Sequence, residues 1–450
     1  MKNKKISRRN FIKLGGLAGA GFVFVPFVSG CGGDDSANNG DTKPVNPGTG
    51  VKVGDVLSDW AEGYLDIHVI NTGRGESTLY IFPDGTTMLV DAAGSLTDIG
   101  DADEDAGVPT TPPKPNASIT SGQVVVDYVN HFAKAASNKL NYLMLSHFHP
   151  DHMGSYSTSV PMATSGDFRL TGITEVGAKV KFDKLIDRGY PNYNFPEDLT
   201  TSSYFSTAGH NMMKNYIKFV NWAVGNGSTA EQFEVGRNDQ LTLKQNPSKY
   251  SNFQIRNIVS NGIVWTGTGT GVKNTFPDGS VVAAATYKNE NVNSIGFQLK
   301  YGGFDYFAGG DLQYTNRSLY AWLDIEKPVA EVVTAVDVMK TNHHCTSNCN
   351  SDVLVAKLKP RVALVHSWRE KHPYPATAKR FYDLNCDLFS TCVMEANKPL
   401  LASYMSKILS TQGHIVVRVA PGGLQYKIYV LDDSNQEYII KSISGPYQSA

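Results

Sequence analysis

Residues 145–154 read Leu-Ser-His-Phe-His-Pro-Asp-His-Met-Gly, which places His147, His149, Asp151 and His152 within six residues. The apolar residues just before these side chains predict a short buried strand. A turn after the strand lets side chains two, four and five positions apart converge, as one regular helix or strand would not. Imidazoles and a carboxylate suit zinc, with iron or manganese open. The stretch therefore predicts a dinuclear metal site, and a histidine-rich surface turn is the alternative.

Upstream, residues 65–94 predict strands joined by a tight turn. They contain two alternating apolar runs, the turn Pro83-Asp84-Gly85 and a closing Asp91. This order is typical of a β-meander.

The HxHxDH pattern of residues 147–152, together with residues 65–94, resembles the metallo-β-lactamase-fold superfamily. The sequence of these two stretches is most similar to the extracellular hydrolase domain of ComEC-type DNA-uptake proteins and their secreted relatives. The resemblance implies an α/β fold, a four-layer αββα sandwich. It also implies that Asp91 supports the site from behind the metal ligands, and a plain turn aspartate is the alternative.

Downstream, residues 294–299 and 304–311 predict two more strands, of which the second ends in Gly309-Gly310-Asp311. By the resemblance, Asp311 bridges two metal ions. A carboxylate suits this position because one oxygen per metal holds the pair at the roughly 3.5–4 Å used in two-metal hydrolysis.

Residues 338–344 resemble the family's apolar strand followed by a histidine pair. The family pattern normally continues into Gly-Ser, whereas Cys345 and Thr346 follow here. The resemblance makes His344 a metal ligand and His343 a candidate for contacting the substrate or leaving group. The reverse order stays open, as does a solvated histidine pair.

Residues 361–375 resemble the closing strand and His-Pro of the same subgroup. On this resemblance His372 is an active-site residue that completes a coordination shell or binds a substrate anion. His366 is an alternative, although a structural role suits it better. Many superfamily members carry a further metal-binding histidine before the bridging aspartate; this interval contains only His210, which we interpret as a surface or core residue. The subgroup often lacks that histidine, so one metal's ligand set stays open.

The resemblance implies two divalent metal ions, zinc favoured, with manganese or iron open. The implied ligands are His147 and His149 for one ion, Asp151, His152 and His344 for the other, and Asp311 between them. Such ions activate water for hydrolysis near neutral pH and polarise a phosphoryl or carbonyl oxygen. Asp151, His343 and His372 are the candidates for the catalytic step.

The start of the chain predicts export. Residues 2–13 are basic and contain Arg8-Arg9, and an apolar run follows over residues 14–28. This order is typical of a twin-arginine signal. An uncleaved membrane anchor is the alternative, although the run is short for a spanning helix.

The end of that run, residues 28–31, reads Val-Ser-Gly-Cys and resembles a lipobox. Residues 1–31 are therefore predicted to be a lipoprotein signal, with Cys31 as the lipidated residue that anchors the mature chain to a membrane. Residues 32–56, rich in Gly, Asp, Asn and Pro, predict a flexible linker. We expect the protein at the cell envelope, in the periplasm or on the cell surface.

The remaining residues, 57–450, predict one hydrolase domain. Hydrophobic residues make up 41% and charged residues 18% of the chain, which is enough for a substantial core. The formal net charge is -1. Nucleic acid stays open as a partner, but no basic excess supports it.

Residues 155–292 include a large insertion that we expect to shape the substrate pocket. It contains an aromatic-rich part and a predicted helix over residues 211–223. Aromatic surfaces can stack bases or cage a quaternary ammonium, but a core role is more common. The Gly-Thr repeat at residues 266–271 is not a phosphate-binding loop, because no Gly-Lys-Ser follows it. We expect a flexible hairpin there.

The cysteines besides Cys31 are even in number, which allows two disulfides in an exported chain. They are Cys345, Cys349, Cys386 and Cys392. Their pairing cannot be read from the sequence.

Three classes of function fit these features. The first is a metal-dependent hydrolase acting on an anionic phosphodiester or phosphoester, small molecule or polymer, outside the cytoplasm. The second is a lactamase- or lactonase-type hydrolase; true lactamases usually carry Cys where Asp311 stands. The third is a non-catalytic surface lipoprotein that keeps the fold for binding. Neither the natural substrate nor the oligomeric state follows from the sequence.

Overall fold

The computed structural model describes residues 50–94, 109–277, 289–315 and 318–450. The predicted signal with Cys31, and the linker up to residue 49, lie outside the described residues. Within the described ranges, no helix combines the length and the apolar character needed to cross a membrane.

The first of two nine-stranded sheets in the described chain begins with the strands predicted around residues 65–94. Strands β3, β4, β5 and β6 run parallel to one another, and the others pair antiparallel. In spatial order the strands are β18 (Ile440–Gln448), β17 (Gln425–Leu431), β16 (His414–Val419), β1 (Leu65–Val69), β2 (Thr78–Ile81), β3 (Thr87–Val90), β4 (Leu140–Met144), β5 (Phe182–Asp187) and β6 (Thr229–Gln232).

The second sheet also combines a parallel and an antiparallel part. Strands β11 to β15 are parallel neighbours, and β10, β7, β8 and β9 extend the sheet antiparallel. In spatial order the strands are β15 (Ile408–Ser410), β14 (Asp387–Ser390), β13 (Val362–Val365), β12 (Val338–Lys340), β11 (Phe304–Ala308), β10 (Gly296–Tyr301), β7 (Phe253–Ser260), β8 (Ile263–Trp265) and β9 (Val272–Asn274).

Both faces of the central strands of each sheet are buried, because neighbouring residues of one strand pack into different cores. In β2, Leu79 belongs to one hydrophobic cluster and Tyr80 to the other. The Tyr80 cluster joins the two sheets; the Tyr80 and Tyr306 hydroxyls lie 3.0 Å apart across it. Alternating side chains point to opposite faces of a strand, so this pattern requires a layer on each outer face.

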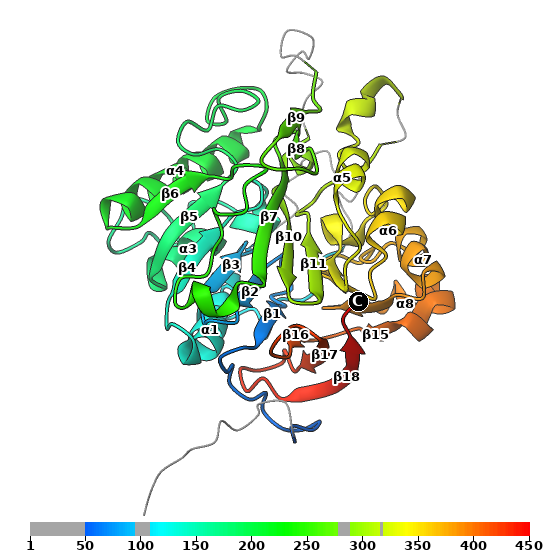
Figure 1. Cartoon of the computed structure of the whole chain (residues 1–450). Helices are drawn as coiled ribbons and strands as arrows, with labels where there is room; N and C mark the ends of the chain where they lie inside the picture. The colour runs from blue at the N-terminus through cyan, green and yellow to red at the C-terminus, as the bar shows by residue number, and fades with distance from the viewer. Residues whose placement is uncertain (1–49, 95–108, 278–288, 316–317) are drawn as a thin grey trace, which may run out of the picture. The chain divides into compact units, whose positions relative to one another are not determined.

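Helices provide those outer layers. Figure 1 shows α1, α3 and α4 beside the first sheet and α5 to α8 beside the second. Their bounds are α1 Ser121–Phe132, α3 Gly172–Lys179, α4 Thr207–Gly225, α5 Glu326–Val332, α6 Asp352–Leu358, α7 Pro375–Asp383 and α8 Lys398–Leu401. Side-chain caps start several of them; Thr120, for example, accepts the backbone N–H of Gln123 before α1. The predicted four-layer αββα sandwich is confirmed.

Residues 155–292 supply parts of both sheets. They contribute β5 and β6 to the first sheet and β7 to β9 to the second, with α3 and α4 outside. The predicted helix is α4, and the Gly-Thr repeat joins β8 to β9 as a hairpin. Tyr193, Tyr216 and Phe219 are buried, which confirms a core role for these aromatic rings.

The four described cysteines are buried free thiols, so the two disulfides that the sequence allowed are not formed. Cys345 and Cys349 follow the histidine pair in the loop after β12, whereas Cys386 and Cys392 flank β14.

Candidate metal centre

The candidate site residues follow the ends of strands at one edge of both sheets. Asp91 follows β3, and the HxHxDH stretch follows β4. Asp311 follows β11, and the histidine pair follows β12. Because parallel strands present their carboxyl ends at the same edge, these loops meet where the two sheets face each other.

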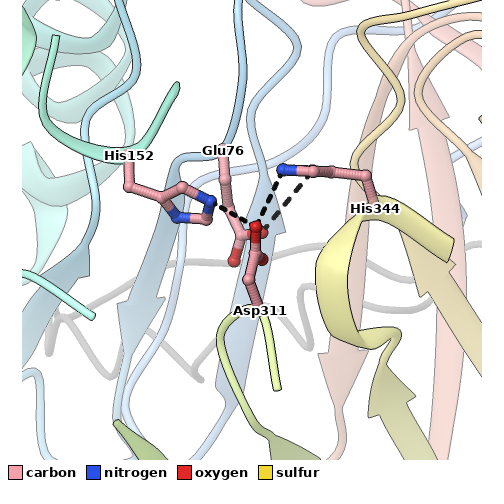
Figure 2. A group of neighbouring side chains, drawn as sticks. All are labelled: Glu76, His152, Asp311 and His344. Atoms are coloured by element: carbon pink, nitrogen blue, oxygen red, sulfur yellow. Dashed lines mark hydrogen bonds and ion pairs between the residues drawn. The ribbon is translucent and has the colours of Figure 1, made fainter. Parts of the chain in front are cut away.

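One carboxylate oxygen, Oδ2 of Asp311, is the centre of the arrangement. Its distance is 3.0 Å to Nε2 of His152 and 3.2 Å to Nε2 of His344. Nε2 of His147 lies 3.9 Å away, and Nε2 of His343 4.0 Å away. Figure 2 shows His152 and His344 pointing at Asp311 from opposite sides. The Asp311 backbone N–H donates to Ser294 at 3.0 Å, which fixes the base of the side chain.

Asp151 adds a second carboxylate. It lies in the short helix α2 (Pro150–Met153), which starts with a proline at its first position. Its Oδ2 is 2.8 Å from Nε2 of His344 and 3.9 Å from Nε2 of His152. Asp151 therefore faces the same two ring nitrogens as Asp311.

Asp91 orients His152 from behind. Its Oδ2 accepts from Nδ1 of His152 at 2.8 Å and from the Ser146 hydroxyl at 2.7 Å, while Oδ1 accepts the Ser146 backbone N–H at 2.7 Å. Because Nδ1 is engaged by Asp91, Nε2 is the nitrogen directed at the site, and it can bind a metal ion once its proton is released. Asp91 has a φ of 62°, a conformation that L residues rarely adopt.

His344 is oriented in the same way by a backbone carbonyl. Its Nδ1 donates to the carbonyl of His366 at 3.0 Å, so Nε2 faces both carboxylates. His343, His344 and Cys345 all have positive φ, at 43°, 52° and 62°. Three consecutive residues in this region are unusual, and such strain is concentrated at functional sites.

The other predicted histidines surround this group at greater distance. The His149 ring lies 4.8 Å from the His147 ring, centre to centre, and the His372 ring stacks on that of His344 at 5.2 Å. His366 contributes through its carbonyl, while its Nε2 lies 3.0 Å from the Thr78 hydroxyl.

His210 does not belong to the group. Its Nε2 lies 2.7 Å from the carbonyl of Ser202.

Two residues that sequence reasoning missed complete the centre. Glu76, His152, Asp311 and His344 lie close enough to share one metal ion, with all candidate ligand atoms within 4.8 Å of one another. Lys340, the last residue of β12, lies 2.8 Å from Oε2 of Glu76 and 3.6 Å from Oδ1 of Asp311. Two features of the sequence could have pointed to them: Glu76 directly follows Gly75, and Lys340 lies in an otherwise apolar strand.

Gly75 allows Glu76 to approach the HxHxDH stretch. A side-chain Cβ at Gly75 would lie 2.0 Å from the Asp151 carbonyl oxygen, and the φ of Gly75 is 122°. That carbonyl accepts the Glu76 backbone N–H at 2.8 Å. Only glycine fits this contact, which ties the loop before β2 to helix α2.

The carboxylates hold positive charge on the histidines. Burial disfavours a charged ring, but Asp311, Asp151 and Asp91 raise the pKa of His152 well above its usual value. Burial likewise opposes charge on His344, yet Asp311 and Asp151 raise its pKa to about 9. Despite burial, His152 and His344 hold the pKa of Asp311 well below its usual range. The site is thus built for buried positive charge.

The residues present fit metal ions. Nε2 of His147 is buried and has no hydrogen-bond partner among the described residues. Burial lowers the pKa of His147 well below its usual value, which leaves a neutral ring with a lone pair to donate. Imidazole nitrogens beside carboxylate oxygens are a donor set that zinc, iron and manganese all accept.

Comparisons with known proteins add a weak likeness in fold. No protein-family model and no curated protein matches the chain. The structure of CmlA, a diiron β-hydroxylase from Streptomyces venezuelae, is similar over 81% of this chain, with a TM-score of 0.36 and 10% identity. The structure of a CmlA mutant is similar over 79% of this chain, with a TM-score of 0.37 and 10% identity. The chain spans about half the length of these two structures, 55% and 54%.

Human tRNase Z, short form, is similar over 72% of this chain and 91% of its own, with a TM-score of 0.29 and 9% identity. At this level of similarity, nothing about activity follows from these proteins.

Proposed function

We propose that this protein is a metal-dependent hydrolase with a dinuclear site, and that its substrate is a phosphodiester or phosphoester. One observation carries the proposal: a single oxygen, Oδ2 of Asp311, is approached by the Nε2 atoms of four histidines. Protein side chains alone do not need such an arrangement, whereas an oxygen shared between two metal ions does.

The chain's own residues would divide the work as follows. Asp311 would hold both ions, His147 and His149 would hold one of them, and Asp151, His152 and His344 would hold the other. Asp91 and the His366 carbonyl fix the ring orientations of His152 and His344. Bound divalent ions supply an activated water and a Lewis acid for the phosphoryl oxygen. His343 and His372, beside this group, are the candidates for contacting the substrate or leaving group.

The phosphoester preference rests on the donor set. The aspartate of the HxHxDH stretch faces the bridging Asp311, and both carboxylates meet at Nε2 of His344. In the resembled superfamily this combination is typical of phosphoester-cleaving branches, in which an aspartate stands where true lactamases usually carry Cys.

The test is turnover of a chromogenic phosphodiester by the purified full-length chain after reconstitution with zinc or manganese. We expect Asp151→Ala to abolish turnover. Asp167→Ala, which removes a carboxylate with 80% of its side chain exposed, is the matched control and should leave turnover unchanged. Hydrolysis of a lactam or lactone without phosphodiester turnover would contradict the substrate class, and metal retention without any turnover would favour a binding lipoprotein.

We further propose that the chain is exported by the twin-arginine route and anchored by a lipid on Cys31, supported by Arg8-Arg9 and by the Val-Ser-Gly-Cys sequence of residues 28–31. Replacing Cys31 with Ser should release the protein from the membrane fraction. A variant that stays in the membrane fraction would contradict lipid anchoring.

A further inference from the structure

Lys340 is a buried lysine directly beside the candidate metal centre. It is 1% exposed, and its ammonium donates to the Gly310 carbonyl at 2.6 Å. Its other neighbours are carboxylates: Glu76 at 2.8 Å and Oδ1 of Asp311 at 3.6 Å. A lysine is seldom buried without a partner, because transferring an unpaired charge out of water is costly. The structure thus places a fixed cation next to the oxygens that would hold metal ions.

The two oxygens of Asp311 have different surroundings. Oδ2 faces the histidine Nε2 atoms, whereas Oδ1 faces Lys340. A divalent ion placed at Oδ1 would lie close to the ammonium and be repelled by it. The sequence-based expectation of one Asp311 oxygen for each metal ion therefore does not match this geometry, which leaves Oδ2 as the shared oxygen.

Glu76 lies on the Lys340 side of the group. Its Oε2 approaches His344 at 4.0 Å, but from the side of Nδ1. That nitrogen is already engaged by the His366 carbonyl, and the metal-facing nitrogen is Nε2. Glu76 is thus close enough to count among possible ligands, yet its nearest partner is the ammonium of Lys340.

We propose that Glu76 and Lys340 form an internal ion pair that bounds the metal centre, and that Glu76 is the counter-charge of Lys340 and no metal ligand. Lys340 is then a positioning residue: its ammonium attracts Oδ1 of Asp311 across 3.6 Å, which keeps Oδ2 turned to the histidine Nε2 atoms. The pair is neutral as a whole, so Asp151 and Asp311 are the carboxylates left for the metal ions. This inference rests on the metal centre of the proposed function, but not on its substrate.

A double-mutant cycle tests the pair in the full-length chain. We would compare wild type, Glu76→Gln, Lys340→Met and the double variant. The readouts are zinc affinity by chelator competition and the absorption spectrum of bound cobalt. Glu76→Gln leaves the ammonium without a counter-charge beside the site. We therefore expect zinc to bind about 10- to 100-fold more weakly, which is the usual effect of removing a residue that contacts a metal ligand. The double variant removes both charges and should return to within about threefold of wild type, with the wild-type cobalt spectrum.

The opposite result has a clear signature. If Glu76 is a ligand, the double variant stays as weak as Glu76→Gln and its cobalt spectrum changes, which overturns the proposal. Should either single variant fail to fold, the double variant against wild type still decides, because it alone replaces the pair by neutral side chains of similar size. A wild-type chain that binds zinc but cleaves no phosphodiester would refute the proposed substrate and leave this test intact.

Discussion

At the scale of single residues, the centre depends on side chains held in unfavourable backbone conformations. Asp91 and the run from His343 to Cys345 all have positive φ. A non-glycine residue in this region costs of order 1–3 kcal/mol, so the surrounding contacts must hold it there. For Asp91 those contacts are the Ser146 backbone and hydroxyl and the His152 ring. The strain and the metal site therefore share the same hydrogen bonds.

We expect Asp91→Asn to weaken zinc binding by about 10- to 100-fold. An amide can offer its own N–H to Nδ1 of His152, which disturbs the ring state that aims Nε2 at Asp311. Chelator competition measures the loss. The matched control is Asp84→Asn, another buried aspartate, which accepts the backbone N–H groups of Thr86, Gln245 and Asn246 away from the site. An equal loss in both variants would contradict a specific role for Asp91.

The HxHxDH stretch could be named from its spacing, and Asp91, Asp311 and His344 from the resemblance; the structure brings these residues together. Glu76 and Lys340 could not be named from the sequence. The spacing of His147 to His152 is local, so its meaning can be read without the fold. Glu76 precedes a strand of the first sheet and Lys340 ends a strand of the second, and each acquires a role only because the other lies 2.8 Å away. No periodicity or spacing in the chain encodes that contact.

At the scale of elements, the loops that carry the ligands are fixed by neighbouring loops more than by their own strands. The loop after β12 is held by Glu326 at the start of α5. Oε1 of Glu326 accepts from the Asn342 side chain at 2.9 Å and from the Asn350 backbone at 2.6 Å. Oε2 accepts the Ser351 backbone N–H at 2.5 Å. One buried carboxylate therefore closes the strained loop that carries His344.

Glu326 makes stability depend on pH. Burial raises its pKa from 4.5 to about 7, although three N–H donors oppose the shift. The unfolded chain releases this proton near pH 4.5, whereas the folded chain keeps it to about pH 7. Stability from this group is therefore lost as the pH rises from about 4.5 to 7, at about 1.4 kcal/mol per unit of pKa difference.

The measurement is the difference in unfolding free energy between wild type and Glu326→Gln, determined by denaturant titration at several pH values. We expect the advantage of the wild type to shrink by a few kcal/mol between pH 4.5 and 7, because glutamine does not titrate. A difference that is constant over this range would contradict the assigned pKa shift.

Gly75, directly before Glu76, makes a second contact that fixes one loop of the site against another. Gly75→Ala places a Cβ against the Asp151 carbonyl and should destabilise the fold by about 3 kcal/mol or more, through the clash and the positive φ. Gly422→Ala is the matched control, since Gly422 has a φ of 84° with open space around it and should cost only about 1–2 kcal/mol. Equal losses in thermal unfolding would mean that the close approach is unimportant.

At the scale of the whole molecule, residues 155–292 reach back to the loop that carries the HxHxDH stretch. Arg188, after β5, is fully buried and pairs with Glu290 at 2.6 Å. The same Glu290 oxygen accepts the Phe148 backbone N–H at 2.8 Å, inside the HxHxDH stretch. We predicted from the sequence that this segment shapes the substrate pocket, but its ties to the site could not be predicted, because they cross between the two sheets.

Replacing one partner of this ion pair should lower the free energy of unfolding more than replacing both partners. We expect Arg188→Met to destabilise the fold by about 3–5 kcal/mol, because Glu290 is left buried and unpaired. Arg188→Met combined with Glu290→Gln should recover a large part of the loss, since Gln still accepts from Phe148. Denaturant unfolding gives both values. A double variant less stable than Arg188→Met alone would contradict this account.

The central claim is that the loops at the shared edge of the two sheets form a metal centre around Asp311. The most direct measurement is the metal content of the full-length chain after equilibration with zinc and removal of unbound ions, compared with Asp311→Asn. We expect about two ions per wild-type chain, as a dinuclear site requires, and at most one in the folded variant. A folded wild-type chain that retains no ion, or a variant that retains as many as wild type, would contradict the account.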